Sequence, residues 1–275
     1  MQPADRGASD GSVVTDQLWK RKLQRELAAA PIASSLLEAV STLPDVDQDD
    51  LRDIIEGQRE DWGEVLHTRF RLPATYKLDH AVALHIYTLE NPRVYSVINR
   101  AMFNPARRQP GTSSSAISDE LRRCIPFIKL VDVALLALPP EYIFRGEVRR
   151  GVQWVYPKPD NHDPKGYFTI GARLCWYEFK STSTEQEVMT RPHFCGVDAG
   201  PRTIFTVQAC RAYNIQKFSI NQGEHSEYEV LFRPLSMFKV VHAQKNIIDP
   251  LNTTSLERSG FPDAIELEQI DDDAP

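Results

Sequence analysis

Two glutamates stand two positions apart in the segment HSEYEVLF, residues 225–232. If this segment is a β-strand, the carboxylates of Glu227 and Glu229 lie on one face, ~7 Å apart along the strand. Two carboxylates in a cleft could exchange protons with a substrate or stabilise a developing positive charge. A half-buried strand with a solvated outer face would show the same pair without any function. This segment alone leaves both interpretations open.

A second candidate is the pair Arg145–Gly146 in the segment IFRGEV. An arginine within an apolar strand either pairs with a structural carboxylate or binds a phosphate through its planar guanidinium group. Gly146 would let a ligand or another strand approach closely. The nearby pair Arg149–Arg150 is expected to be solvated.

Three hydroxyl side chains follow the predicted strand CWYEF, at Ser181, Thr182 and Ser183. Hydroxyl groups at the end of a strand often only hydrogen-bond the backbone of a turn. The functional alternative is that one of them orients a ligand or a carboxylate.

The spacing of the histidine and cysteine residues does not predict a metal site. His80 and His85 lie on one predicted helix, and His193 with Cys195 supplies two ligands at most. The four cysteines have no paired spacing, so we expect reduced thiols.

The elements that must position these residues fall into two groups. Helices are predicted first, from apolar residues at helical spacing and from acidic residues or proline in a first turn. They cover 16–30, 32–43, 45–62, 76–91, 92–104 and 113–138. Short strands are predicted after the two prolines at 139 and 140; they cover 141–150, 152–156, 167–170, 172–179, 203–209, 217–220, 226–232 and 236–241. Helices followed by strands favour an α+β fold, with the helical half packed on a sheet.

Length and charge narrow the class of protein. A chain of 275 residues can bury one substantial core or two small ones. The net charge of −6 argues against a nucleic-acid or anionic-membrane partner. We expect a disordered N-terminus over 1–14, without the charged-then-apolar order of a secretory signal, one domain over 15–245, and an acidic mobile tail over 246–275.

An arginine, a Ser-Thr-Ser run and a Glu-x-Glu pair, each on its own predicted strand, resemble the arginine–serine–glutamate class of mono-ADP-ribosyltransferases. IFRGEV resembles the aromatic-Arg-Gly strand of that family, EFKSTST its Phe-x-Ser-Thr-Ser strand, and SEYEVLFRP its Glu-x-Glu strand. The likeness extends from about residue 76 to 241.

The resemblance implies a helical N-terminal half packed on a split, mixed or antiparallel β-sheet core, an α+β fold that holds NAD in a cleft between two sheets. It implies that Glu229 is the catalytic carboxylate and that Glu227 orients or deprotonates the guanidinium group of an acceptor. Arg145 would bind an NAD phosphate, and Ser181 would help to hold the NAD and the catalytic glutamate. The NAD-binding residues implied by the resemblance are Arg145, Gly146, Ser181, Thr182, Ser183 and Phe194, whose ring would stack on nicotinamide.

The implied activity is transfer of ADP-ribose from NAD to arginine side chains of a target protein, with NAD as substrate and no metal. Two alternatives remain open: an NAD glycohydrolase, and a non-catalytic module that binds NAD. The implied partner is an acceptor protein with an exposed arginine, and we expect a monomer with no nucleic-acid or membrane partner. The missing signal, lipid anchor and disulfides point to the cytoplasm, or to delivery into a host cytosol as an effector.

Overall fold

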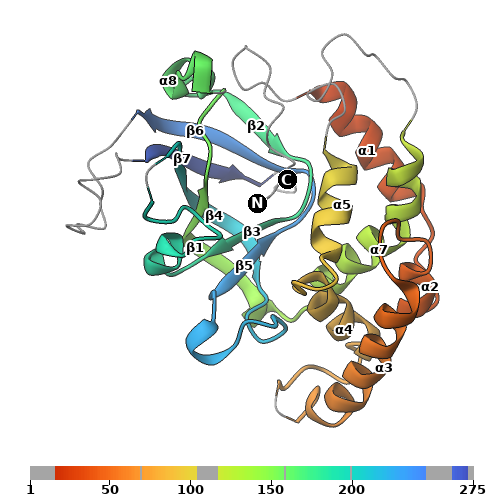
Figure 1. Cartoon of the computed structure of the whole chain (residues 1–275). Coiled ribbons are helices and arrows are strands. Elements are labelled where there is room, and N and C mark those ends of the chain that lie inside the picture. Colours follow the sequence, from red (N-terminus) through yellow and green to blue (C-terminus); the bar gives the residue numbers. More distant parts are fainter. Residues whose placement is uncertain are drawn as a thin grey trace.

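The computed structural model describes residues 16–68, 70–103, 117–157, 159–198, 200–245 and 262–271. The helices are α1 (Gln17–Ala29), α2 (Leu36–Val40), α3 (Gln48–Val65), α4 (Leu78–Tyr87), α5 (Val94–Met102), α7 (Asp119–Leu136) and the short α8 (Pro164–Tyr167). Of these, α1 to α7 lie on one side of the molecule, and the strands lie on the other together with the short helix α8 (Figure 1). Short 3₁₀ turns include η4 (Gln186–Thr190) and η5 (Gly223–His225).

Capping side chains begin helices α1 and α7, at the predicted start for α1 and at Asp119, not at residue 113 as predicted, for α7. The Asp16 carboxylate accepts a hydrogen bond from the Trp19 amide at 3.0 Å, and the Ser118 hydroxyl accepts one from the Leu121 amide at 3.1 Å. Helix α4 is buried over most of its length because it packs against α3 and α7 within the helical core. The ring of its last residue, Tyr87, lies 5.4 Å from the ring of Phe179, which directly precedes strand β3 (Lys180–Ser183).

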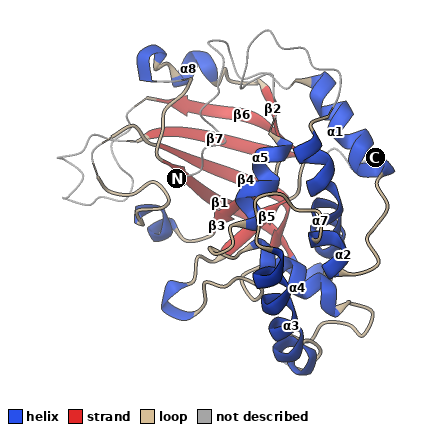
Figure 2. Cartoon of the chain, turned by 45° about the vertical axis from the view of Figure 1, so that its right-hand side comes forward, coloured by secondary structure: helices blue, strands red, loops and turns tan. Residues whose placement is uncertain are grey.

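Seven strands form one mixed sheet, which the helices cover on one side (Figure 2). The strands are β1 (Ile143–Val152), β2 (Arg173–Trp176), β3 (Lys180–Ser183), β4 (Thr203–Asn214), β5 (Glu229–Phe232), β6 (Ser236–Gln244) and β7 (Asp263–Ile270). Their order is β1-β3-β5-β4-β7-β6-β2, and β1 also pairs with β4. Only the β4–β7 pair is parallel among the described pairs. The predicted α+β class, with helices packed on a mixed β-core, is confirmed.

Four of these strands pair in a closed circuit. β1 pairs with β3 at Arg149–Ser183 and with β4 along most of its length. β3 pairs with β5, and β5 pairs with the end of β4. The circuit therefore brings together the C-terminal end of β1, the whole of β3 and the start of β5.

The predicted mobile tail is wrong for residues 263–270. These residues form β7, which lies inside the sheet between β4 and β6. Ile265 and Leu267 are fully buried while the glutamates that follow each of them are exposed, which is the alternation of a half-buried strand. The high acid content of the segment hides this pattern. Residues 246–261 and 272–275 of the predicted tail lie outside the described residues, as does the predicted disordered segment 1–14.

Three short apolar segments predicted as strands are not strands. Residues 152–156 add only Val152 to the end of β1, residues 167–170 continue from Tyr167 at the end of the short helix α8, and residues 217–220 form a turn. The last two segments each carry an aromatic side chain into a core, since Phe168 is 3% exposed and Phe218 is fully buried. An apolar run of four residues fits a buried turn as well as a strand, because periodicity does not separate the two over so short a length.

Within the described ranges, no helix is both long and apolar enough to cross a membrane. All four cysteines are free thiols.

Candidate active site

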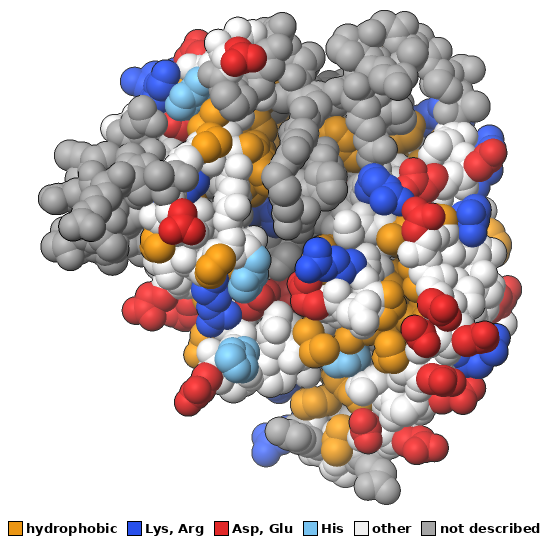
Figure 3. All heavy atoms as spheres, viewed as in Figure 1, with side chains coloured by type: hydrophobic (Ala, Val, Ile, Leu, Met, Phe, Trp, Pro, Cys, Tyr) orange, Lys and Arg blue, Asp and Glu red, His pale blue; other side chains and the backbone are white. Residues whose placement is uncertain are grey.

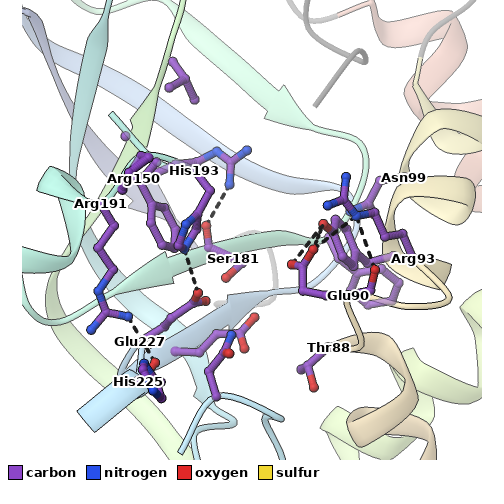
Figure 4. A pocket seen from close by; sticks show the side chains of 18 of the residues that line it. Thr88, Glu90, Arg93, Asn99, Arg150, Ser181, Arg191, His193, His225 and Glu227 are labelled. Atoms are coloured by element: carbon purple, nitrogen blue, oxygen red, sulfur yellow. Dashed lines mark hydrogen bonds and ion pairs between the residues drawn. The ribbon is translucent and has the colours of Figure 1, made fainter. Parts of the chain in front are cut away.

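A cavity of about 710 Å³ opens between the helical layer and the closed strand circuit. The connection from α4 to α5 lines one wall, and the ends of β1, β3 and β5 line the other (Figure 4). Acidic, basic and histidine side chains gather on the face of the molecule between the strands and the helices (Figure 3). A ligand in this cavity would therefore contact charges of both signs.

Glu229, the first residue of β5, lines the cavity and is only 5% exposed. Burial raises the pKa of its carboxyl group to about 7. A hydrogen bond with the Ser181 hydroxyl opposes this rise, the charge of Glu227 adds to it, and a hydrogen bond with Ser219 opposes it again. At neutral pH the group is therefore balanced between its ionised and protonated forms.

Glu227 lines the same cavity but does not lie on the strand. Tyr228 has φ +48°, in the left-handed region, and its side chain is 41% exposed. The prediction that strand alternation places both carboxylates on one face is therefore wrong; a sharp turn at Tyr228 brings them together instead. Burial raises the pKa of Glu227, while a hydrogen bond with His193, at 3.2 Å between Nε2 and Oε1, lowers it.

Ser181 is the one member of the Ser-Thr-Ser run that lines the cavity. The Thr182 hydroxyl donates to the Val230 carbonyl at 2.7 Å, and the Ser183 hydroxyl accepts from the Glu185 amide at 3.0 Å. Both of these side chains are buried and serve the β3–β5 pair and the turn after β3.

The predicted pair Arg145–Gly146 lies outside the cavity. Arg145 is exposed next to a bulge in β1, and Gly146 faces the ring of Phe144. Arg150, five positions further along, lines the cavity and is 7% exposed. The expectation that Arg150 is solvated is therefore wrong.

Arg150 is fixed by a hydrogen bond from its Nη1 to the backbone carbonyl of Ser181, at 2.9 Å. The sequence holds two Arg-Gly pairs in this strand, and the odd spacing between them would turn the two arginines to opposite faces of an unbroken strand. That spacing is the signal that could have identified Arg150.

The segment 191–196, which crosses β1 at Gly151, forms a third wall of the cavity. A Cβ atom on Gly151 would lie 2.7 Å from both the backbone nitrogen and the Cβ of Cys195, so only glycine allows the segment 191–196 to cross β1 here. This segment brings Arg191, His193 and Phe194 to the cavity. Phe194 is therefore at the cavity, as the sequence predicts.

No sequence motif marks the residues on the opposite wall. Glu90 forms an ion pair with Arg93, at 3.1 Å between Oε2 and Nε, and accepts a hydrogen bond from the Tyr95 hydroxyl at 3.2 Å. Figure 4 shows Glu90 and Arg93 across the cavity from Ser181 and Glu227. The charge of Glu90 helps to raise the pKa of both Glu227 and Glu229, so it faces the same space.

The described part of the chain holds no group of three or more histidine, cysteine, aspartate or glutamate side chains arranged for a metal ion. Buried carboxylates opposite guanidinium groups fit a ligand that carries anionic groups and a reacting centre that becomes cationic.

The sequence model of the family described as NAD:arginine ADP-ribosyltransferase matches residues 41–253, more than half of the chain. No curated protein matches the chain significantly in sequence.

Solved structures share the fold. The type III effector XopAI from Xanthomonas axonopodis pv. citri has a TM-score of 0.61 and 17% identity, over 93% of this chain and 96% of that chain. The eukaryotic mono-ADP-ribosyltransferase ART2.2 has a TM-score of 0.54 and 15% identity, over 98% and 96%. The ADP-ribosyltransferase HopU1 of Pseudomonas syringae pv. tomato has a TM-score of 0.51 and 18% identity, over 94% and 99%.

Proposed function

Because the chain belongs to the NAD:arginine ADP-ribosyltransferase family, for which NAD is a substrate, we propose that it transfers ADP-ribose from NAD to arginine side chains of a protein and releases nicotinamide. The observation that carries this proposal is the meeting of Glu229, Glu227, Ser181 and Arg150 in one cavity. Water in place of the arginine would make the same site an NAD glycohydrolase.

Glu229 acts on the donor. Breaking the bond between nicotinamide and ribose develops positive charge on the ribose, as in glycoside cleavage. An ionised Glu229 accepts a hydrogen bond from a ribose hydroxyl and stabilises this charge most strongly in the transition state. Nicotinamide leaves as a neutral molecule from a cationic ring, so the step needs no general acid.

Arg150 and Ser181 position the donor. The guanidinium group of Arg150 takes the role that the resemblance implied for Arg145, and binds a phosphate of NAD. Ser181 hydrogen-bonds Glu229 and holds its carboxylate toward the ribose. Phe194 offers its ring to nicotinamide at the wall that Gly151 makes possible.

Glu227 acts on the acceptor. A protonated arginine is a poor nucleophile, so a second carboxylate near the reacting ribose orients it and removes a proton as it attacks. The acceptor is a protein with an exposed arginine, and the enzyme acts as a monomer. Its catalytic unit extends to β7, beyond the limit at residue 245 that the sequence predicts. Since XopAI, a type III effector, shares the fold, action in a host cytosol after delivery is part of the proposal.

The test is incubation of the purified protein with labelled NAD, first with arginine methyl ester and then with a cell lysate. We expect label on the ester and on lysate proteins, and loss of the protein label in hydroxylamine, which cleaves arginine-linked ADP-ribose. Glu229→Gln is expected to abolish transfer and nicotinamide release, whereas Glu227→Gln is expected to abolish transfer and to keep most of the release. Release without labelling would establish the glycohydrolase. Full transfer by Glu229→Gln would refute the assignment of the catalytic carboxylate.

A further inference from the structure

The contact between His193 and Glu227 gives the second carboxylate a partner that can carry protons. His193 Nε2 lies 3.2 Å from Glu227 Oε1, and both residues line the cavity. The two side chains differ in exposure, since that of Glu227 is 15% exposed and that of His193 is 59% exposed. Figure 4 shows the imidazole ring pointing to the carboxylate from the segment above it. The pair therefore connects the interior of the cavity with solvent.

The backbone around this contact is held at a second point. Arg191 donates to the carbonyl oxygens of His225 and Ser226, at 3.0 and 2.9 Å. These carbonyls directly precede Glu227, so Arg191 ties the segment of His193 to the segment of Glu227. The ring of His193 also lies 4.7 Å from the ring of Phe194, centroid to centroid. The contact is therefore a built feature of the cavity wall and not a chance meeting of two surface side chains.

The charges around the pair are mixed. Arg191 acts on Glu227 from the same segment as His193, Glu229 from β5, and Glu90 from the opposite wall. The Tyr95 hydroxyl also feels the charge of Glu227. The negative charges of the two nearby carboxylates favour the protonated form of Glu227. Turnover therefore requires a route by which the proton leaves Glu227.

We propose that His193 is the proton acceptor behind Glu227, and that the two form a relay that carries the proton of the acceptor guanidinium group to water. This inference rests on the proposed arginine transfer. As the guanidinium nitrogen forms its bond to ribose C1′, the bond between C1′ and nicotinamide breaks and its electron pair leaves with nicotinamide. The attacking nitrogen loses one proton to Glu227, and the imidazole of His193 accepts that proton from Glu227 and releases it to solvent. The products are the ADP-ribosylated guanidinium cation, neutral nicotinamide and one proton, which balances the step. Hydrolysis of NAD also releases one proton, but the attacking water can lose it directly to neighbouring water molecules, so hydrolysis does not need the relay.

The test compares transfer to arginine methyl ester with nicotinamide release in the absence of acceptor. His193→Gln keeps a hydrogen-bond donor near Glu227 but cannot carry a proton. We expect its kcat for transfer to fall at least about tenfold, with nicotinamide release within about twofold of the wild type. His242→Gln, on β6 away from the cavity, is the matched control and is expected to match the wild type in both reactions.

A second variant separates proton transfer from positioning. In His193→Gly, added imidazole is expected to restore transfer, and the rescue is expected to grow with pH as more of the imidazole becomes neutral. Unchanged transfer in His193→Gln, or a rise in the KM for the ester alone together with no imidazole rescue in His193→Gly, would overturn the relay. If the wild type releases nicotinamide but modifies no arginine, the proposed function itself fails, and the relay falls with it.

Discussion

Glu229 is placed where a carboxylate is costly to ionise. Its pKa of about 7 lies above its ordinary value of 4.5 because the side chain is buried. For a carboxyl group raised in this way, the folded state holds its proton to a higher pH than the unfolded state does. The carboxyl group of Glu229 therefore contributes fully to the free energy of unfolding below pH 4.5, and this contribution is lost as the pH rises through about 7. The loss is on the order of 3 kcal/mol at most.

Glu229→Gln is therefore expected to stabilise the protein while it removes activity. At pH 8 its free energy of unfolding should exceed that of the wild type, and the difference should shrink as the pH falls toward 4.5. Urea unfolding at a series of pH values measures it. Exposed Glu268→Gln on β7 serves as the control and should show no such trend. If the Glu229→Gln variant were less stable than the wild type at pH 8, the claim that the ionised, buried carboxylate of Glu229 destabilises the fold would be contradicted.

The two arginines of β1 provide a matched pair of variants. Arg150→Ala is expected to raise the KM for NAD by about 10- to 100-fold, because a charge-assisted hydrogen bond is worth about 1.5–3 kcal/mol. Arg145→Ala, from the exposed position outside the cavity, is expected to leave KM and kcat unchanged. Nicotinamide release at varied NAD concentration measures both. A larger effect at Arg145 would return the phosphate-binding role to the residue that the sequence motif favours.

Residue types and motif order predict much of the candidate site from the sequence. Ser181, Glu227, Glu229 and Phe194 all reach the cavity. Arg150 was missed because two Arg-Gly pairs occupy one strand and the motif fits either. The wall around Glu90 was missed because its residues lie in a connection between helices, where no local pattern shows which side chains will face distant strands.

At the scale of elements, local rules predict some helix ends and strands and miss others. The start of α1 and the first seven residues of β4 are predicted from the sequence, whereas α7 begins at Asp119, six residues after its predicted start. The turn at Tyr228 was not visible, because a tyrosine is not a typical residue for the left-handed region. Tertiary packing, and not local preference, decides that backbone conformation.

The crossing of segment 191–196 over β1 can be tested at Gly151. Gly151→Ala would place a methyl group 2.7 Å from the Cys195 backbone, so the segment must move outward. Because this segment carries His193 and Phe194, we expect a lower kcat, a higher KM for NAD and a lower Tm. Gly57→Ala in helix α3 has free space around it and is expected to raise stability by up to about 1 kcal/mol. Wild-type kinetics for Gly151→Ala would show that the crossing does not set the cavity.

At the scale of the whole molecule, the sheet depends on its last described strand. β7 separates β4 from β6, so a chain shortened to residue 245 would leave both strands unpaired on their inner edges and would expose the apolar residues of the core that β7 covers. We expect this variant to be insoluble or to lack a cooperative thermal transition by circular dichroism. A soluble, cooperatively folded protein would restore the interpretation of the segment as a tail. The order of strands in such a sheet is set by contacts between residues distant in sequence. The residue pattern within one segment does not predict these contacts.

The closed circuit of β1, β3, β5 and β4 links the chemistry to global unfolding. β1, β3 and β5, which carry Arg150, Ser181 and Glu229, each pair with two neighbours, although β1 and β3 pair only at Arg149–Ser183 and the Ser181 carbonyl is bonded by the Arg150 side chain. Displacing one of these strands breaks backbone pairings with two neighbours, and we expect its backbone amides to exchange with deuterium as slowly as those of the core. On heating, catalytic competence and folded structure should then disappear together, with no folded but inactive species between them.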